Sequence, residues 1–136
     1  MLTVPTADVE EALVRWVREW LDMLAAGRLA EACARLDAPA PDGERWTPER
    51  IVALVQDTYG EGTPFRREHP EGPMFTPVAS AGDRLRVDVI EYEDGSGYWI
   101  DHDVPLNGGA SDLTAQFEFT RRGGEFEVML HDLHVM

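Results

Sequence analysis

Residues 98–136 read YWIDHDVPLNGGASDLTAQFEFTRRGGEFEVMLHDLHVM, and this C-terminal stretch decides the fold. Between residues 113 and 120, apolar and polar side chains alternate almost without exception. Because successive residues of a strand point to opposite faces of a sheet, the alternation predicts a strand with one buried face and one wet face. The pair Gly123-Gly124 that follows predicts a hairpin turn, since glycine tolerates the positive φ values of tight hairpins.

Two flanking segments extend this sheet. Residues 98–106 place His102 on the apolar face and place Trp99, Asp101 and Asp103 on the opposite face. In the last segment the apolar residues change parity after Leu130. A β-bulge near residues 131–132 would return Leu133 and Val135 to the core, and we expect one there. With alternating residues near 85–92, the sheet has four to five antiparallel strands.

Three helices are predicted ahead of the sheet. Apolar residues recur at three- and four-residue spacing from Val9 to Leu24, and a second short stripe covers residues 29–36. The third helix begins at Thr47-Pro48, where threonine is suited to cap the helix and proline to its first position. Glycine and proline then mark residues 60–77 as a long loop.

In that loop, Phe65, Met74 and Phe75 are the expected anchors to the core. The order of elements predicts an α+β fold, in which about three N-terminal helices pack on one face of a curved antiparallel sheet. We expect a single domain over residues 1–136, a length suited to one hydrophobic core.

The composition restricts the classes of partner. The chain carries 26 acidic and 12 basic residues, for a net charge of −14. This balance argues against nucleic acid and anionic membranes, because both select basic surfaces, and it is compatible with a basic protein partner. Solubility alone also accounts for an acidic surface. No apolar run is long enough to cross a membrane and no signal-peptide pattern is present, so a cytoplasmic location is expected.

The chemistry-bearing residues suggest no cofactor or metal. Cys33 is the only cysteine and lies on the stripe of the second helix, where it is expected to be a small core residue. Asp101, Asp103 and His131 could ligate a cation on the wet face, but we favour a solvated acidic strand, because this spacing is only a weak indication of a metal site. We therefore expect neither a metal site nor a bound cofactor.

Two resemblances bear on family. A long amphipathic helix, a Gly-Arg-Leu-Ala-Glu-Ala helix at residues 27–32 and a terminal curved sheet resemble the NTF2-like (cone-shaped α+β) superfamily. That resemblance implies a pocket between sheet and helices, which some members use for isomerisation, dehydration or cyclisation. The pattern of Pro105-Leu106, Gly109, residues 111–114 and residues 132–135 is similar to a family of small uncharacterised bacterial proteins, which implies no activity.

One candidate site would be catalytic. If the last strand ran without a bulge, Asp132 and His134 would face inward beside His102, and a carboxylate next to an imidazole can make it a general base. The chain would then be a small pocket enzyme of the isomerase, dehydratase or cyclase type, acting on a small apolar ligand. With a bulge, Asp132 and His134 point to solvent and His102 is a satisfied, semi-buried residue.

The other candidate site would bind a protein. Trp99, Asp101, Asp103, Glu118 and Glu127 share the wet face by alternation, and an aromatic among acids is typical of a protein-binding patch. Trp99 could instead pack under residues 60–77 or lie in a homodimer interface. We favour a non-catalytic binding module of NTF2-like fold, whose acidic face docks a basic protein as an immunity protein docks a cationic toxin.

Overall fold

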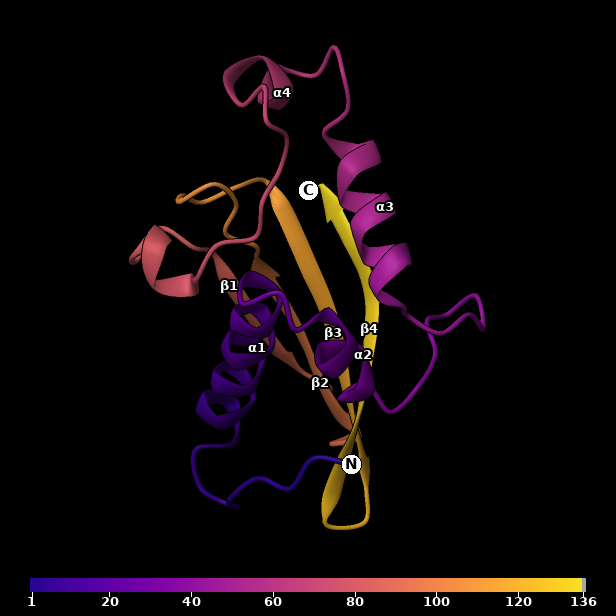
Figure 1. Ribbon diagram of the computed structural model, residues 1–136. Coiled ribbons are helices and arrows are strands. Elements are labelled where there is room, and N and C mark those ends of the chain that lie inside the picture. Colours follow the sequence, from indigo (N-terminus) through magenta and orange to yellow (C-terminus); the bar gives the residue numbers. More distant parts are fainter. Residues whose placement is uncertain (136) are drawn as a thin grey trace.

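The computed structural model describes residues 1–135 and has the α+β architecture that the sequence predicts (Figure 1). Helices come first along the chain: α1 (Val9–Ala25), α2 (Leu29–Ala34), α3 (Pro48–Thr58), α4 (Pro64–Glu68) and the short 3-10 helix η1 (Val78–Ala81). The strands follow as β1 (Val87–Glu91), β2 (Gly97–Asp103), β3 (Leu113–Arg122) and β4 (Glu125–Val135). They form one antiparallel sheet in chain order, β1-β2-β3-β4.

Helix α1 packs on the inner face of the sheet through aromatic side chains. Its apolar stripe is buried, with Trp16 and Trp20 at its centre. The Trp16 ring packs edge-on against Phe117, with the ring centroids 5.6 Å apart. The Trp20 ring packs against the same phenylalanine with a centroid distance of 5.2 Å. Such edge-to-face pairs add to the stability that burying the rings supplies. One continuous cluster of buried residues thereby joins the N-terminal helices to the sheet.

Helix α3 begins as predicted and is tied to the last strand. The Thr47 side chain accepts a hydrogen bond from the Arg50 backbone NH at 3.1 Å, and Pro48 opens the helix. The preceding Trp46 is buried, and its indole NH donates to the Leu130 carbonyl of β4 at 2.8 Å. This bond and the buried Ile51 hold α3 beside the edge of the sheet.

The segment from residue 60 to 77 contains a helix that periodicity did not predict. Helix α4 is only five residues long, too short to show an apolar stripe. It nevertheless carries the same starting signal as α3, because the Thr63 side chain accepts from the Arg66 NH and Pro64 follows. Phe65 and Phe75 pack against the core as expected. The prediction for Met74 is wrong, since it is 54% exposed.

The expected bulge is present in β4. Gln116 of β3 pairs with Asp132, whereas the next residue, Phe117, pairs with Leu130, so His131 is the extra residue. Leu133 returns to the core as predicted. Val135 does not, because it is 37% exposed at the end of the strand.

The hairpin between β3 and β4 also has the expected geometry, with Gly123 at φ 64°. Strand β2 is shorter than predicted and ends at Asp103. Within the described chain, no helix is both long enough and apolar enough to cross a membrane.

Candidate functional site

The face of the sheet opposite α1, which we call the outer face, carries the predicted binding residues. Asp88 and Ile90 of β1, Trp99 of β2, Glu118 of β3 and Met129 of β4 alternate with the buried residues of their strands. Register places Ile90, Trp99, Glu118 and Met129 in one row across the sheet. Ile90 is 55% exposed, which is unusual for isoleucine. The acids of this face include Asp88, Asp101, Asp103, Glu118, Glu127 and Asp132.

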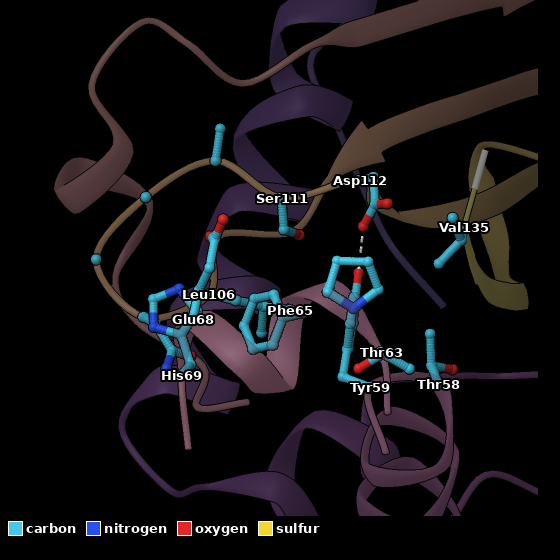
Figure 2. Close-up of a pocket in the computed structure, with 15 residues that line it drawn as sticks. Thr58, Tyr59, Thr63, Phe65, Glu68, His69, Leu106, Ser111, Asp112 and Val135 are labelled. Carbon is cyan, nitrogen blue, oxygen red and sulfur yellow. Dashed lines mark hydrogen bonds between the residues drawn. The ribbon is translucent and has the colours of Figure 1, made fainter. Parts of the chain in front are cut away.

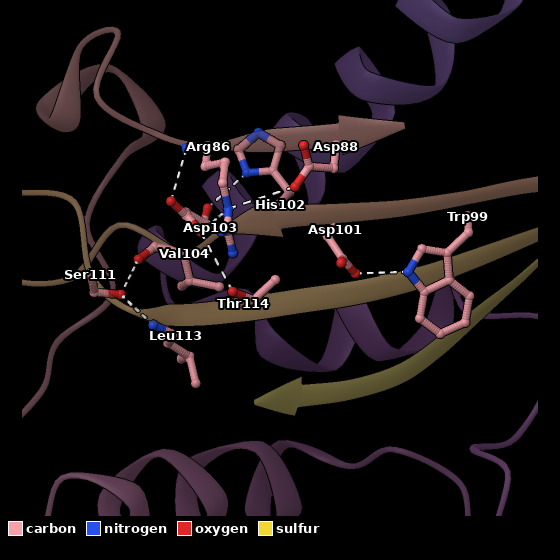
Figure 3. Close-up of polar contacts among 10 residues, drawn as sticks. All are labelled: Arg86, Asp88, Trp99, Asp101, His102, Asp103, Val104, Ser111, Leu113 and Thr114. Carbon is pink, nitrogen blue, oxygen red and sulfur yellow. Dashed lines mark hydrogen bonds and ion pairs between the residues drawn. The ribbon is translucent and has the colours of Figure 1, made fainter. Parts of the chain in front are cut away.

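Trp99 lies in the middle of the outer face and is held in place. Its indole NH donates to the Asp101 carboxylate at 2.8 Å (Figure 3). On its other side the ring contacts His131, the bulge residue, at 4.6 Å. Trp99 therefore contacts side chains of its own sheet, and the alternative that it packs beneath residues 60–77 does not match these contacts. Trp99 is half-buried by its neighbours on the same face. Its ring is therefore held in one orientation before any partner binds.

Glu118 is linked to two neighbouring strands. The Tyr92 hydroxyl, just beyond β1, donates to the Glu118 carboxylate at 2.6 Å. Burial raises the pKa of the Tyr92 hydroxyl well above its ordinary value, and the Glu118 carboxylate raises it further. The His131 imidazole lies 3.7 Å from the other Glu118 oxygen. These contacts fix the carboxylate beside Trp99.

Asp103, by contrast, serves the fold. One of its oxygens accepts from the Arg86 backbone NH at 2.8 Å, and the other lies 3.5 Å from the Thr114 hydroxyl (Figure 3). Its side chain is only 14% exposed. The Arg86 guanidinium also approaches it, at 3.9 Å. Asp103 is on the outer face as predicted, but its carboxylate is occupied within the protein.

The structure does not assemble the predicted catalytic group. His102 pairs across the sheet with Ala115, which pairs with Leu133, and all three side chains are on the inner face. Asp132 and His134 pair with Gln116 and Thr114 and are therefore on the outer face, 3.9 Å from each other. The grouping of His102 with Asp132 and His134, expected only for a strand without a bulge, does not form, and the bulge at His131 turns Asp132 and His134 outward as the favoured interpretation had it.

His102 is instead enclosed and satisfied. It is 0% exposed, its Nδ1 lies 2.7 Å from the Asp103 carbonyl oxygen, and its Nε2 accepts from the Arg18 Nε at 3.2 Å. These contacts define a neutral imidazole protonated at Nδ1. Burial lowers the pKa of His102, and the Arg18 charge lowers it further, while the contacts with Asp103 oppose the shift.

The three side chains considered as ligands of a cation contact separate partners. Asp101 binds Trp99, Asp103 binds the Arg86 backbone, and His131 approaches Glu118. Among residues 1–135, no group of three or more His, Cys, Asp and Glu side chains is arranged to hold a metal ion.

A cleft of about 590 Å³, which the sequence did not predict, lies between α4 and the loop that joins β2 to β3 (Figure 2). The end of α3 and α4 form one side of it, and the loop between β2 and β3 forms the other. Tyr59 spans the two sides, because its hydroxyl donates to Asp112 at 2.6 Å. Two local features of the sequence mark the segments that form the cleft: the Thr-Pro helix start at residues 63–64 and the turn at residues 107–109. Their spatial proximity has no signature in the sequence.

Comparison with known proteins identifies a family and no activity. No curated protein matches the chain, and no solved structure matches it. One family model, described as "Domain of unknown function (DUF7668)", matches residues 47–136. The match runs from the start of α3 through β4, so it includes the whole sheet and all residues of the cleft, whereas α1 and α2 precede it. The chain belongs to this family, DUF7668.

Proposed function

We propose that this protein is a non-catalytic binding module that docks a basic protein on the outer face of its sheet. The observation that carries the proposal is the row of Ile90, Trp99, Glu118 and Met129 on a face that α1 does not cover, because its three apolar side chains lie among carboxylates. An aromatic and apolar centre with a charged surround is the usual composition of a protein interface.

Charge selects the kind of partner. The carboxylates of the outer face outnumber its arginines, Arg86 and Arg122, and both arginines already pair with acids of the same face. The net charge of the chain has the same sign, at −14. A basic partner is therefore attracted at long range and gains ion pairs on docking, which raises its association rate. A second copy of this chain would bring the same acids against this face, so like-charge repulsion disfavours a homodimer here.

An immunity-type protein that neutralises a basic toxin would dock its partner in this way, and the acidic charge and the hydrogen-bonded side chains of the outer face suit that role. The helices on one side of a curved sheet also support kinship with the NTF2-like superfamily. We include a bacterial origin and a cytoplasmic location in the proposal, the latter because the chain has a single cysteine and no disulfide.

The test compares two double variants with matched chemistry. Asp88→Asn with Ile90→Ser removes one charge and one exposed apolar group from the outer face. Asp57→Asn with Val52→Ser makes the same change on α3, where Val52 is 46% exposed. Proteins retained from an extract of the encoding cells by the immobilised wild type are identified, and the purified partner is titrated calorimetrically against all three proteins.

The partner is expected to be basic. Its affinity should fall about ten-fold for the outer-face variant, because the two substitutions together remove an apolar contact and an ion pair, a loss of about 1.4 kcal/mol. The α3 variant should bind like the wild type, and added salt should weaken binding. Equal affinities for the two variants, or a partner without excess basic charge, would contradict the proposal, as would the capture of no partner.

A further inference from the structure

The cleft between α4 and the β2–β3 loop is distinct from the outer face and has its own chemistry. None of its lining residues belongs to the row of Ile90, Trp99, Glu118 and Met129. Its volume of about 590 Å³ is in the range of sites that hold small organic molecules. Leu106 and Val135 contribute apolar surface, while Ser111 and Asp112 border it on the loop side (Figure 2).

One wall of the cleft is a run of three rings. The Tyr59 and Phe65 rings have their centroids 4.5 Å apart, and the His69 ring follows at 4.6 Å from Phe65. Tyr59 is buried, and its hydrogen bond to Asp112 prevents the ring from turning away. Aromatic rings carry negative quadrupoles that attract cations, so this wall favours a positively charged ligand.

The charges that border the cleft are negative. Asp112 and Glu68, from opposite sides, are both exposed and both line it. No arginine is among the described lining residues. The two arginines of α4 are directed elsewhere, because Arg66 donates to the Tyr59 carbonyl and to Gln56, and Arg67 donates to the Gly62 carbonyl. An anionic ligand would meet the carboxylates of Asp112 and Glu68 and no arginine among the described lining residues.

We propose that this cleft binds a small organic cation, an ammonium group attached to an aromatic or alkyl body. The apolar body packs against Phe65, Leu106 and Val135. The ammonium group lies between the aromatic wall and the carboxylates of Asp112 and Glu68, where cation–π attraction and ion pairing act together. This site is independent of the outer face, so it holds whether or not a basic protein docks there.

Three probes of matched size test the ligand class. Phenethylammonium, neutral phenethyl alcohol and anionic hydrocinnamate are each titrated into the full chain, and backbone amide signals are followed by heteronuclear NMR. Phenethylammonium is expected to shift the signals of Phe65 and Asp112 saturably. Equal or tighter binding of the alcohol or of hydrocinnamate overturns the proposal, and so does the absence of a saturable shift with phenethylammonium.

Charge variants test the site. Asp112→Asn keeps an acceptor for the Tyr59 hydroxyl, and Glu68→Gln alters an exposed side chain of α4. Each is expected to weaken phenethylammonium binding about two- to five-fold, the effect of one exposed ion pair. Glu93→Gln removes the same charge in the turn between β1 and β2 and should leave the affinity unchanged. Wild-type affinity in both cleft variants, or an equal loss in Glu93→Gln, overturns the assignment.

Discussion

Gly97 shows how one residue without a side chain permits β2 to pair closely with β3. It opens β2 opposite Thr120 of β3, and a Cβ atom there would overlap the Phe119 carbonyl oxygen. Gly97→Ala is therefore expected to lower the free energy of unfolding by about 2 kcal/mol, as for other overpacked sites. Gly124→Ala is the control, because a Cβ there meets no atom within 4 Å. Urea denaturation of both variants measures the difference, and equal stabilities would contradict the steric argument.

His102 makes the stability depend on pH. Its pKa is lowered in the folded protein, so between that lowered value and the ordinary 6.5 the unfolded chain binds a proton that the folded chain does not. The free energy of unfolding should therefore fall as pH decreases below 6.5, by at most about 1.4 kcal/mol per pH unit from this group. His102→Gln should reduce that dependence. Denaturation curves across this range measure it, and an unchanged slope in the variant would be inconsistent with a buried neutral imidazole.

At the scale of elements, the bulge decides which face each end of β4 presents. Leu130 and Leu133 are both buried although an odd-even count separates them, because His131 is the extra residue. Deleting His131 restores simple alternation and leaves both leucines inward. Deleting Met129 also shortens β4 by one residue, but it turns Leu130 outward and places His131 opposite Phe117 in the core.

The Met129 deletion should thus lower the free energy of unfolding by at least about 3 kcal/mol more than the His131 deletion, because it exposes a buried leucine and buries an imidazole. Chemical denaturation of the two deletion variants compares them directly. Similar losses of stability would mean that the register does not control the facing of β4.

Short elements were less predictable than long ones. The stripe of α1 and the alternation of β3 were evident because many residues repeat the same spacing. Helix α4 has too few residues for any period, and its local signal was the pair of Thr63 as cap and Pro64 as first residue. The exposure of Met74 and Val135 depends on where neighbouring segments end, which spacing does not encode.

At the scale of the whole molecule, the inner face of the sheet is apolar and covered by helices, and the outer face is acidic and uncovered. Alternation correctly placed Trp99, Asp101, Asp103 and Glu118 together, because the side-chain period of a strand is a local property. It could not show that Asp103 holds the Arg86 backbone while Asp101 holds Trp99. The Arg86 backbone belongs to the segment that precedes β1, and the Trp99 side chain turns along its own strand to reach Asp101.

The sequence by itself determined the α+β class, the order of helices and strands, the hairpin at Gly123 and the acidic outer face. These follow from periodicity, turn chemistry and charge, which act between residues close in the chain. Only the tertiary structure decided that Asp132 and His134 lie on the face of the sheet that His102 does not share. It alone also decided that Tyr59 and Asp112, 53 residues apart, meet across a cleft. Such contacts depend on register and packing between distant segments, and their geometry arises only when the chain has folded.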